Sequence, residues 1–266
     1  MQEKTFETRH LQCTYRKTVT QTHNIFENHC HLQFELIAVF EGSVSVQIEG
    51  TKYRLTSCAA ALIPPLTYHS VSSDKSALYQ RITFLFDRSF IPEEIQTDFL
   101  EKLQTHPIVT HDSLQFVFAR LFQTFQEENL SIYAPLLESL LVQIFYIHTY
   151  QDISPSCKQT NPALQAITEY IHSHICEKIS LDDIAGALFL SKSAVCHLFK
   201  EHMNISVKQY ILQKKMTYAA QLIQNGMPAT DAAHCVGYEN YTNFYKIYCK
   251  VFQTTPSGFK YNRKQI

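Results

Sequence analysis

The chain has 266 residues, with 23 Lys and Arg against 24 Asp and Glu, and so a formal net charge of −1. A chain of this length can form two domains, each with its own core. The near balance excludes a uniformly basic nucleic-acid-binding protein, but the charge is unevenly placed. Residues 1–160 carry 12 basic and 17 acidic side chains, whereas residues 200–266 carry 9 and 3. Only the last third is therefore expected to approach phosphates.

The eight cysteines form no CxxC pair and no zinc-finger spacing. Several lie in apolar helical stretches, so we expect buried free thiols, and we expect this of Cys30, Cys196 and Cys235 in preference to redox sensing. With an N-terminus that lacks an apolar signal region, these thiols predict a reducing cytoplasm. No window of 18 residues is both uncharged and apolar, so we expect no membrane span.

The first part of the chain, from about 11 to 87, has the texture of short strands separated by turn signals. Many short strands at even spacing predict a small antiparallel barrel or sandwich. The predicted strands are Phe34–Phe40, Val44–Glu49, Lys52–Leu55, Ala60–Ile63 and Tyr79–Phe86.

From about 91 to 150 the apolar period becomes helical. Ser113–Glu127 has one apolar side, and Pro135–Tyr150 has an apolar stripe wider than one buried face needs. Either this second helix only packs on the barrel, or it also forms a dimer seam; the sequence leaves both open.

The polar stretch Gln151–Asn161 reads as an interdomain linker. Pro162 suits the first position of a helix over Ala163–Cys176. We therefore predict a domain over residues 1–150, a linker over 151–161 and a second domain over 162–266.

The second domain contains an internal repeat between Ser180 and Lys264. Ala185 and Ala233 are each followed, ten or eleven residues later, by the start of an apolar helical pattern. A small residue at a helix crossing, a short turn and a second helix are the pattern of a helix–turn–helix unit. The sequence therefore predicts two such units.

One long helix, Val207–Gln224, is predicted between the two units, with Ser206 as N-cap and Gly226 as stop. At 1.5 Å per residue, about 18 residues span roughly 27 Å. With the half-widths of the flanking units, this would hold the two exposed helices about one turn of B-DNA apart, roughly 34 Å.

Each unit presents one predicted reading helix, Lys192–Glu201 in the first and Tyr241–Phe252 in the second. Lysine and asparagine side chains on such helices can bind bases or phosphates. The alternative is an ordinary helical bundle with a solvated face, but two copies in register favour DNA. The outward residues are Lys192, Ser193, Ala194, Cys196, His197, Lys200, Tyr241, Thr242, Asn243, Lys246 and Lys250.

Residues 163–264 resemble the tandem helix–turn–helix domain of AraC/XylS-type transcription regulators. The resemblance is carried by LDDIAGALFLSKSAVCHLFK, KQYILQKKMTYAAQLI and AAHCVGYENYTNFYKIYCKVFQTTPSGFK. It implies base-facing positions at Ser193, Cys196 and His197 in the first reading helix, and at Tyr241, Thr242, Asn243 and Lys246 in the second.

The chain departs from the family pattern at several positions. Phe189, Asn204 and Gln253 stand where small residues or glycine are usual, and Lys215 and His197 replace usual arginines. Asparagine tolerates a left-handed turn better than glutamine does. These departures bear on affinity and sequence preference rather than on architecture.

A second constellation consists of His29, His31 and Glu35, followed by His69 after Pro64–Pro65. On a strand, positions 29, 31 and 35 would share one face. If that face is the barrel interior, His69 from a later strand can join them. Three imidazoles and a carboxylate suit Zn, Fe, Mn or Ni.

This constellation resembles the two metal motifs of cupin barrels, with Leu66 in place of the second motif's glycine. In regulators of this kind the resemblance implies that the barrel more often holds a small effector. Three readings stay open: a bound divalent metal, polar lining of an effector pocket, or purely structural histidines. Tyr15, Arg16 and Arg81 are further possible pocket groups.

The predicted fold is therefore an α+β multidomain chain: a cupin-like β-barrel with a helical dimerisation segment, then an all-α tandem helix–turn–helix domain. The predicted function is a cytoplasmic, effector-responsive transcription regulator and not an enzyme. Activation, a homodimer and contact with RNA polymerase are expected besides double-stranded DNA. The alternatives are a metal-dependent cupin enzyme with a DNA-binding tail and an adaptor that acts by protein contacts.

Overall fold

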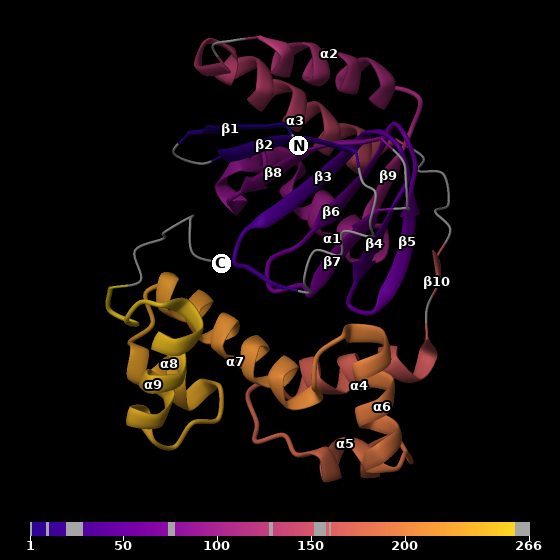
Figure 1. Ribbon diagram of the computed structural model, residues 1–266. Coiled ribbons are helices and arrows are strands. Elements are labelled where there is room, and N and C mark those ends of the chain that lie inside the picture. Colours follow the sequence, from indigo (N-terminus) through magenta and orange to yellow (C-terminus); the bar gives the residue numbers. More distant parts are fainter. Residues whose placement is uncertain are drawn as a thin grey trace. The chain divides into compact units, whose positions relative to one another are not determined.

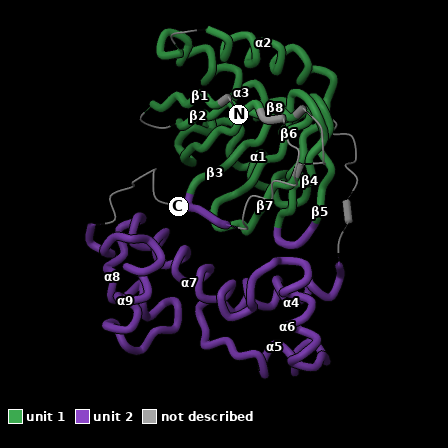
Figure 2. The backbone as a smooth tube through the Cα atoms, in the orientation of Figure 1, with its two compact units in different colours: residues 1–27, 33–48, 52–159 green, residues 28–32, 49–51, 160–266 purple. Residues whose placement is uncertain are grey.

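The computed structural model describes residues 2–8, 11–19, 29–73, 78–127, 130–151, 158–159 and 161–258. Its contacts divide the chain into two compact units (Figure 2). The first comprises residues 1–27, 33–48 and 52–159, and the second comprises residues 160–266 with the short pieces 28–32 and 49–51. Residues 259–266, where the predicted repeat ends, and most of the predicted linker lie outside the described residues.

The first unit is built on two sheets that face each other (Figure 1). Their orders are β1-β2-β8-β3-β6-β9 and β10-β5-β4-β7, and the described pairings are antiparallel. The strands are β1 Gln2–Glu7, β2 Leu11–Val19, β3 Phe34–Glu41, β4 Val44–Ile48, β5 Thr51–Leu55, β6 Ala59–Ile63, β7 His69–Ser73, β8 Leu78–Phe86, β9 Ile108–Thr110 and β10 Lys158–Gln159.

Alternation along β3 separates two apolar cores. Ile37 and Val39 point into a cluster shared with β4, β5 and β7, which fills the space between the sheets. Leu36 and Ala38 point into a second cluster, shared with the helices. Because side chains alternate with a period of two, Glu35 shares the face of Ile37 and lies on the barrel interior.

Three helices cover the outer face of the six-stranded sheet: α1 Gln96–Thr105, α2 Leu114–Gln126 and α3 Ala134–Tyr150. The ring of Phe145 on α3 lies 5.0 Å from the ring of Phe86 on β8 and 5.0 Å from that of Phe99 on α1. Helix α3 therefore packs on the barrel, as one of the two readings of its wide apolar stripe predicted.

The segment Leu130–Tyr150 is long and apolar enough to cross a membrane, by length and composition alone. The sequence expectation concerned windows of 18 residues without charge, and Glu138 interrupts this stretch, so that expectation is not contradicted. A core helix of a soluble protein passes the same test, and α3 buries Leu137, Leu141 and Ile144 in the core beneath the sheet.

The second unit is helical. Its elements are α4 Pro162–Ser173, α5 Leu181–Ala187, α6 Lys192–Met203, α7 Val207–Gln224, α8 Ala229–Cys235 and α9 Tyr241–Phe252. Polar side chains begin most of them, because the first amides of a helix lack partners within it. Ser180 forms a capping box with Asp183, while Ser191, Ser206 and Asn240 each accept a bond from the third residue along.

Several elements differ from the prediction. The strands β1, β2, β7 and β9 and helix α1 were not predicted individually, and the β-rich part begins at Gln2 rather than near Leu11. The first strand has polar and charged side chains on one face, which obscures its pattern, and it lies at the edge of the sheet. The helix predicted to Cys176 ends at Ser173.

Candidate nucleic-acid interface and barrel site

Helix α6 presents the first candidate reading surface. Val195 and Phe199 are fully buried and Leu198 is half-buried, so one side of the helix faces its own unit. The predicted outward residues are exposed except for Ala194, which is half-buried. Those exposed are Lys192, Ser193, Cys196, His197 and Lys200.

Two polar contacts hold part of this surface in place. Lys192 Nζ lies 2.5 Å from Oδ1 of Asp182, and His197 Nδ1 lies 3.5 Å from Oε2 of Glu201. Both pairs are well exposed, so each contributes little to stability and both side chains can turn to a phosphate.

Helix α9 presents the second candidate surface and begins and ends where predicted. Thr242, Asn243, Lys246 and Lys250 are exposed. Tyr241, predicted to face outward, is half-buried, and its ring lies 5.9 Å from the buried ring of Phe244. It packs at the edge of the apolar core that contains Phe244, Tyr248 and Phe252.

Tyr245 is an exposed residue of α9 that the sequence reasoning missed. Its side chain is 37% exposed, and its ring lies 6.2 Å from that of Tyr241. The signal was its position three residues after Thr242 on the polar side, but Tyr245 was not included in the predicted outward set.

Three turn residues of the second unit have left-handed backbone conformations. The φ angles are 54° at Phe189, 56° at Asn204 and 53° at Gln253. Asn204 and Gln253 are the C-caps of α6 and α9. These are positions that the family resemblance marks as usually small or glycine, and a residue without a Cβ adopts such angles at little cost.

Helix α7 has the bounds predicted for the spacer. Ser206 caps its N-terminus, and its 18 residues correspond to about 27 Å. Ala185 of α5 and Ala233 of α8 are both buried, as expected of small residues where helices cross. The second unit therefore contains two helix–turn–helix pairs joined by one continuous helix.

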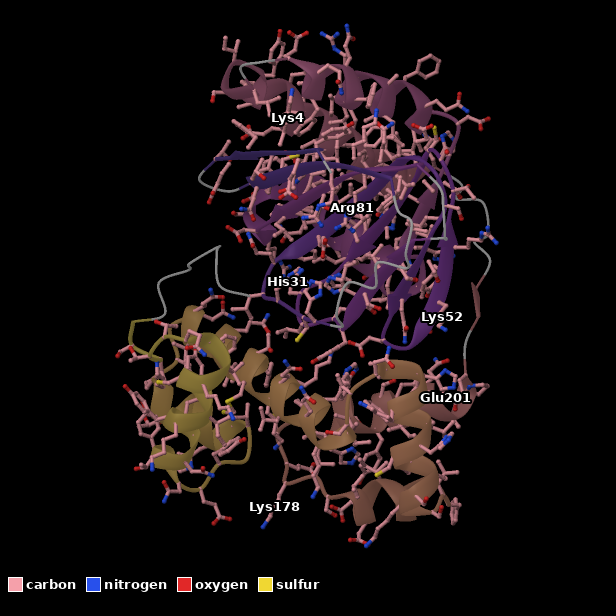
Figure 3. All side chains as sticks on the ribbon, in the orientation of Figure 1. Lys4, His31, Lys52, Arg81, Lys178 and Glu201 are labelled. Carbon is pink, nitrogen blue, oxygen red and sulfur yellow. The ribbon has the colours of Figure 1, made fainter. Side chains whose placement is uncertain are left out.

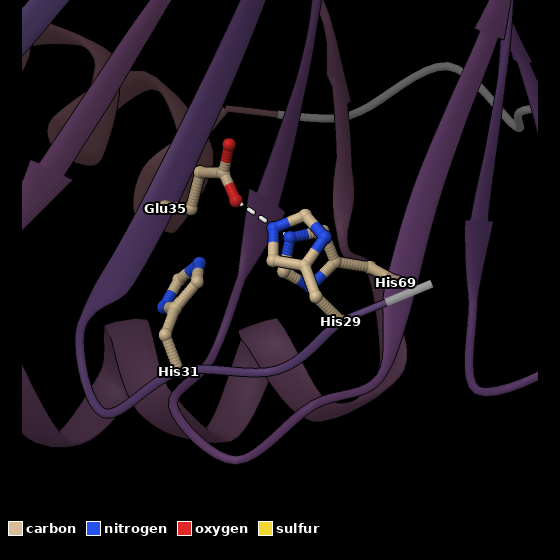
Figure 4. A group of neighbouring side chains, drawn as sticks. All are labelled: His29, His31, Glu35 and His69. Atoms are coloured by element: carbon tan, nitrogen blue, oxygen red, sulfur yellow. Dashed lines mark ion pairs between the residues drawn. The ribbon is translucent and has the colours of Figure 1, made fainter. Parts of the chain in front are cut away.

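In the barrel, the four predicted residues come together (Figure 4). Each of His29, His31, Glu35 and His69 offers a ligand atom, and these atoms all lie within 4.8 Å of one another. Three of the four side chains are buried, and that of His29 is half-buried. The predicted convergence is confirmed for all four.

The reason given for that convergence was partly wrong. Strand β3 begins only at Phe34, so strand alternation does not place His29 and His31. They lie on the segment that leads into β3. His29 forms an isolated β-bridge there, and His31 is not part of a strand. Glu35 comes from β3 and His69 from the first position of β7, which belongs to the opposite sheet.

The hydrogen bonds of His69 fix which of its nitrogens faces the cluster. Its Nδ1 lies 2.9 Å from the backbone oxygen of Thr67, which can only accept, so Nδ1 carries the proton. Its Nε2 lies 2.7 Å from Oε2 of Glu35. A neutral ring would direct a lone pair at this carboxylate, so the pair needs a shared cation, either a proton between Nε2 and the carboxyl group or a metal ion.

These residues fit a divalent metal ion. Ligands bound at about 2.1 Å around one centre lie about 3 to 4.2 Å apart, close to the observed spread. A metal-binding histidine usually donates its other N–H to a carbonyl or carboxylate, as His69 does to Thr67. Leu66 occupies the place of the motif's glycine and has a φ of 66°. A residue with a side chain thus adopts here a left-handed conformation that favours glycine.

Comparison with known proteins finds a matching protein family for each of the two units. The family of AraC-like ligand-binding domains matches residues 14–145, and a helix-turn-helix domain family matches residues 184–262. The chain belongs to the AraC/XylS-type transcription regulators. The predicted fold class is confirmed.

Two relatives illustrate the similarity. The regulator is 29% identical over 96 residues to the probable transcriptional regulator LumQ of Photobacterium leiognathi, covering 36% of this chain and 39% of LumQ. It is 28% identical over 131 residues to the Msm operon regulatory protein of Streptococcus mutans, covering 49% of this chain and 46% of that protein. The regulator therefore spans less than half the length of these relatives.

Among solved structures, ToxT from Vibrio cholerae matches 94% of the regulator and 97% of its own chain, at 16% identity and a TM-score of 0.41.

The other proposed pocket groups of the regulator take different places. Tyr15 lies in the core beneath the helices, where its hydroxyl donates to Oε1 of Gln80 at 3.0 Å and its ring stacks 5.8 Å from Phe125. Arg16 forms an ion pair with Glu3 at 2.8 Å. Arg81, labelled in Figure 3, shares the β8 face of Tyr79, whose hydroxyl lies 3.5 Å from its Nη1. Tyr15 is therefore not a barrel-pocket residue.

The cysteines of the regulator were only partly predicted. Cys30 is buried, and burial raises the pKa of its thiol. Cys196 and Cys235 are exposed, so the expectation of burial was wrong for both. The exposure of Cys196 agrees with its predicted place among the outward residues of the first reading helix.

Proposed function

We propose that this regulator binds double-stranded DNA in a sequence-specific manner and activates transcription in response to a small molecule in its barrel. One observation carries the DNA-binding part. Two helix–turn–helix pairs, joined by the continuous helix α7, each expose a polar helix side while burying the other. The residues proposed to contact DNA are Lys192, Ser193, Cys196, His197, Lys200, Thr242, Asn243, Lys246 and Lys250.

The arrangement supports recognition rather than only electrostatic attraction. Asn243 is exposed in the first turn of α9, where a side chain can reach a base edge, and asparagine can bond adenine at two atoms. Lys250 lies in the last turn of the same helix and suits a phosphate. Two helices of this kind, about one duplex turn apart, would read successive major grooves.

The test is footprinting of the purified protein on genomic DNA, with and without candidate metabolites. Protected sites with two boxes about one helical turn apart are expected, together with binding that weakens steeply as salt rises. A protein with Lys246→Glu and Lys200→Glu should give no footprint while retaining its melting temperature. If the wild-type protein protects no DNA, the proposed function is wrong and an adaptor that acts by protein contacts becomes the better explanation.

We further propose that the effector site is centred on a divalent metal ion held by His29, His31, Glu35 and His69. The partly exposed edge at His29 leaves room for a ligand to approach the ion. A bound ion would supply a Lewis-acid position for an oxygen or nitrogen donor of the effector. The protein's own contribution is to orient His69 through Thr67 and to exclude bulk water by burial.

Homodimerisation through α3 is also part of the proposal. Large apolar side chains are exposed on α3, where Tyr146 is 41% and Tyr150 56% exposed, and on the short 3-10 turn before it, where Ile132 is 72% exposed. Exposed apolar surface of this kind often marks a protein interface. Tyr146→Lys should shift sedimentation toward the monomer, whereas Gln104→Lys, at an exposed position on α1, should not. Contact with RNA polymerase and a cytoplasmic location complete the activator proposal.

A metal-dependent cupin enzyme with a DNA-binding tail is the second candidate, because the histidine–carboxylate set also suits catalysis. The two differ in what the metal changes. Under the regulator proposal, loading the metal alters DNA affinity and the effector is recovered unchanged. Conversion of a bound compound, with DNA affinity unaffected by the metal, would favour the enzyme.

A further inference from the structure

Lys215 lies at the middle of α7 and joins the two helix–turn–helix units directly. Its side chain is buried, and its Nζ donates to the backbone oxygens of Glu177 and of Val236, the latter at 2.6 Å. Glu177 lies on the loop that precedes α5, and Val236 is the C-cap of α8. The ammonium group of Lys215 thus links the loop before α5, in the first helix–turn–helix pair, to the C-terminus of α8, in the second pair.

Burial of this ammonium is costly in itself. Desolvation lowers the pKa of Lys215, so its charged form is retained against the preference of the surroundings. Two features offset this cost. A charged donor forms stronger hydrogen bonds than a neutral one, and the carbonyls at a helix C-terminus carry partial negative charge. An apolar side chain of similar length would fill the space but would give no directional link.

The two helix–turn–helix pairs also approach each other closely at this point. Gly237, with φ 79°, follows the carbonyl that Lys215 binds. A Cβ at this position would lie 3.0 Å from Nζ of Lys215 and 3.2 Å from the backbone oxygen of Glu177. The turn after α8 is therefore pressed against the loop before α5, and only glycine has both the conformation and the space that this requires.

A cavity of about 310 Å³ lies beside the joint. Its lining comes from both units and from α7, and includes Lys178 of the loop before α5, which is labelled in Figure 3. Side chains do not fill this side of the joint, so the hydrogen bonds of Lys215 supply a directional link there that packing does not. The other lining residues are Ile179, Lys208, Ile211, Leu212, Lys215, Gly237 and Tyr238.

We infer that Lys215 is a positioning residue that fixes the two reading helices relative to each other and thereby sets the spacing of the DNA boxes that the regulator accepts. This inference rests on the proposed DNA-binding function. Lys215 itself would not contact DNA, because both of its described bonds are to the protein backbone.

The test uses the full-length protein and a duplex that the wild-type protein selects from a random library. Three companion duplexes carry one scrambled box, one inserted base pair or two inserted base pairs. Lys215→Met should lower affinity for the intact two-box duplex about 10-fold or more, because the second box is bound less readily once the first is held. It should change the affinity for the one-box duplex by no more than about 2-fold. It should also reduce the loss of affinity that an inserted base pair causes.

Two further variants separate positioning from folding and from charge. Lys215→Arg keeps a buried donor and should restore most of the two-box affinity. Lys208→Met removes a cation from the rim of the same cavity, two turns away on α7, and should leave the spacing preference unchanged. Equal loss on one-box and two-box duplexes in Lys215→Met would overturn the inference.

Hydrogen exchange provides a reading that needs no DNA. In Lys215→Met, amides of residues 176–180 and 236–238 should exchange faster together, while those in the middle of α6 and α9 keep their protection. Unchanged exchange in both loops would overturn the inference even for a protein that selects no duplex. If Lys215→Met does not fold, Lys215→Gln, which retains an N–H donor, takes its place in both experiments. Failure of the wild-type protein to select DNA would instead count against the proposed function.

Discussion

The Nε2 atom of His69 lies 2.7 Å from Oε2 of Glu35, although the two residues belong to opposite sheets of the barrel. The proton on Nδ1 is directed to Thr67, so the side of the ring that faces Glu35 needs a cation. We therefore expect purified protein to bind one equivalent of Zn²⁺, Mn²⁺ or Ni²⁺ per chain, measured by elemental analysis after dialysis.

Replacement of a ligand tests this site. Glu35→Gln and His69→Gln should each weaken metal binding by calorimetry on the order of 100-fold, because each removes a donor from a small ligand set. His106→Gln is the matched control, because that side chain is exposed outside the cluster and should leave the affinity unchanged. Equal affinities for all three variants would contradict the metal proposal.

Asn243 and Lys250 should behave differently, although both are exposed on α9. Asn243→Ala is expected to reduce discrimination between the selected and mismatched duplexes by about 1–3 kcal/mol. Lys250→Ala should weaken both duplexes alike and lower the salt slope by about 1, as loss of a phosphate contact does. Fluorescence anisotropy titrations over a salt series give both quantities, and an equal loss on random DNA for Asn243→Ala would count against base contact.

Ala233 is 1% exposed in the core of the second helix–turn–helix unit. Ala233→Leu should lower the free energy of unfolding by about 1–3 kcal/mol, because the larger side chain forces α8 away from its neighbours. Ala187→Leu, at an exposed end of α5, is the control and should change stability little. Chemical denaturation measures both, and a wild-type midpoint in Ala233→Leu would show that the helix crossing has room for a larger side chain.

Phe189 is 95% exposed and has a φ of 54°. A left-handed conformation costs a side-chain-bearing residue about 1–2 kcal/mol, and glycine's extra unfolded-state freedom offsets about 0.5–1 kcal/mol of the relief. Phe189→Gly should therefore stabilise the protein by about 0.5–1 kcal/mol. Phe189→Ala removes the ring but keeps the Cβ, so no such gain is expected in thermal unfolding.

His148 is fully buried on α3, where its Nε2 donates to the backbone oxygen of His106 at 2.9 Å. Burial lowers its pKa to about 4 from an unfolded value of about 6.5. Between these values the unfolded chain binds the proton more readily, so stability falls as pH falls from about 6.5 to about 4. The full difference corresponds to about 3 kcal/mol.

His148→Gln keeps an N–H donor for His106 but does not titrate. Its unfolding free energy, measured by urea denaturation at several pH values, should decline less than that of the wild-type protein over this window. Parallel profiles for the two proteins would show that His148 does not cause the acid sensitivity.

Local patterns were sufficient for much of the second unit. The bounds of α7 and α9 were predicted from apolar periodicity and, for α7, from the cap Ser206 and the stop at Gly226, because these signals act between residues within one or two turns. The apolar sides of the reading helices followed from the same period. Edge strands such as β1 were missed, because a strand at the edge of a sheet need not alternate clearly.

The sequence by itself determined the two-part organisation, the repeated helix–turn–helix pattern and the residue types available for metal and DNA. Only the tertiary structure decided which distant groups meet. That His69 Nε2 faces Glu35 depends on the turn at Leu66 and on the stacking of two sheets, and that Lys215 binds Glu177 and Val236 depends on how two loops close around α7. Short-range periodicity encodes elements, whereas the meeting of residues far apart in the chain depends on loop geometry and packing that no local pattern specifies.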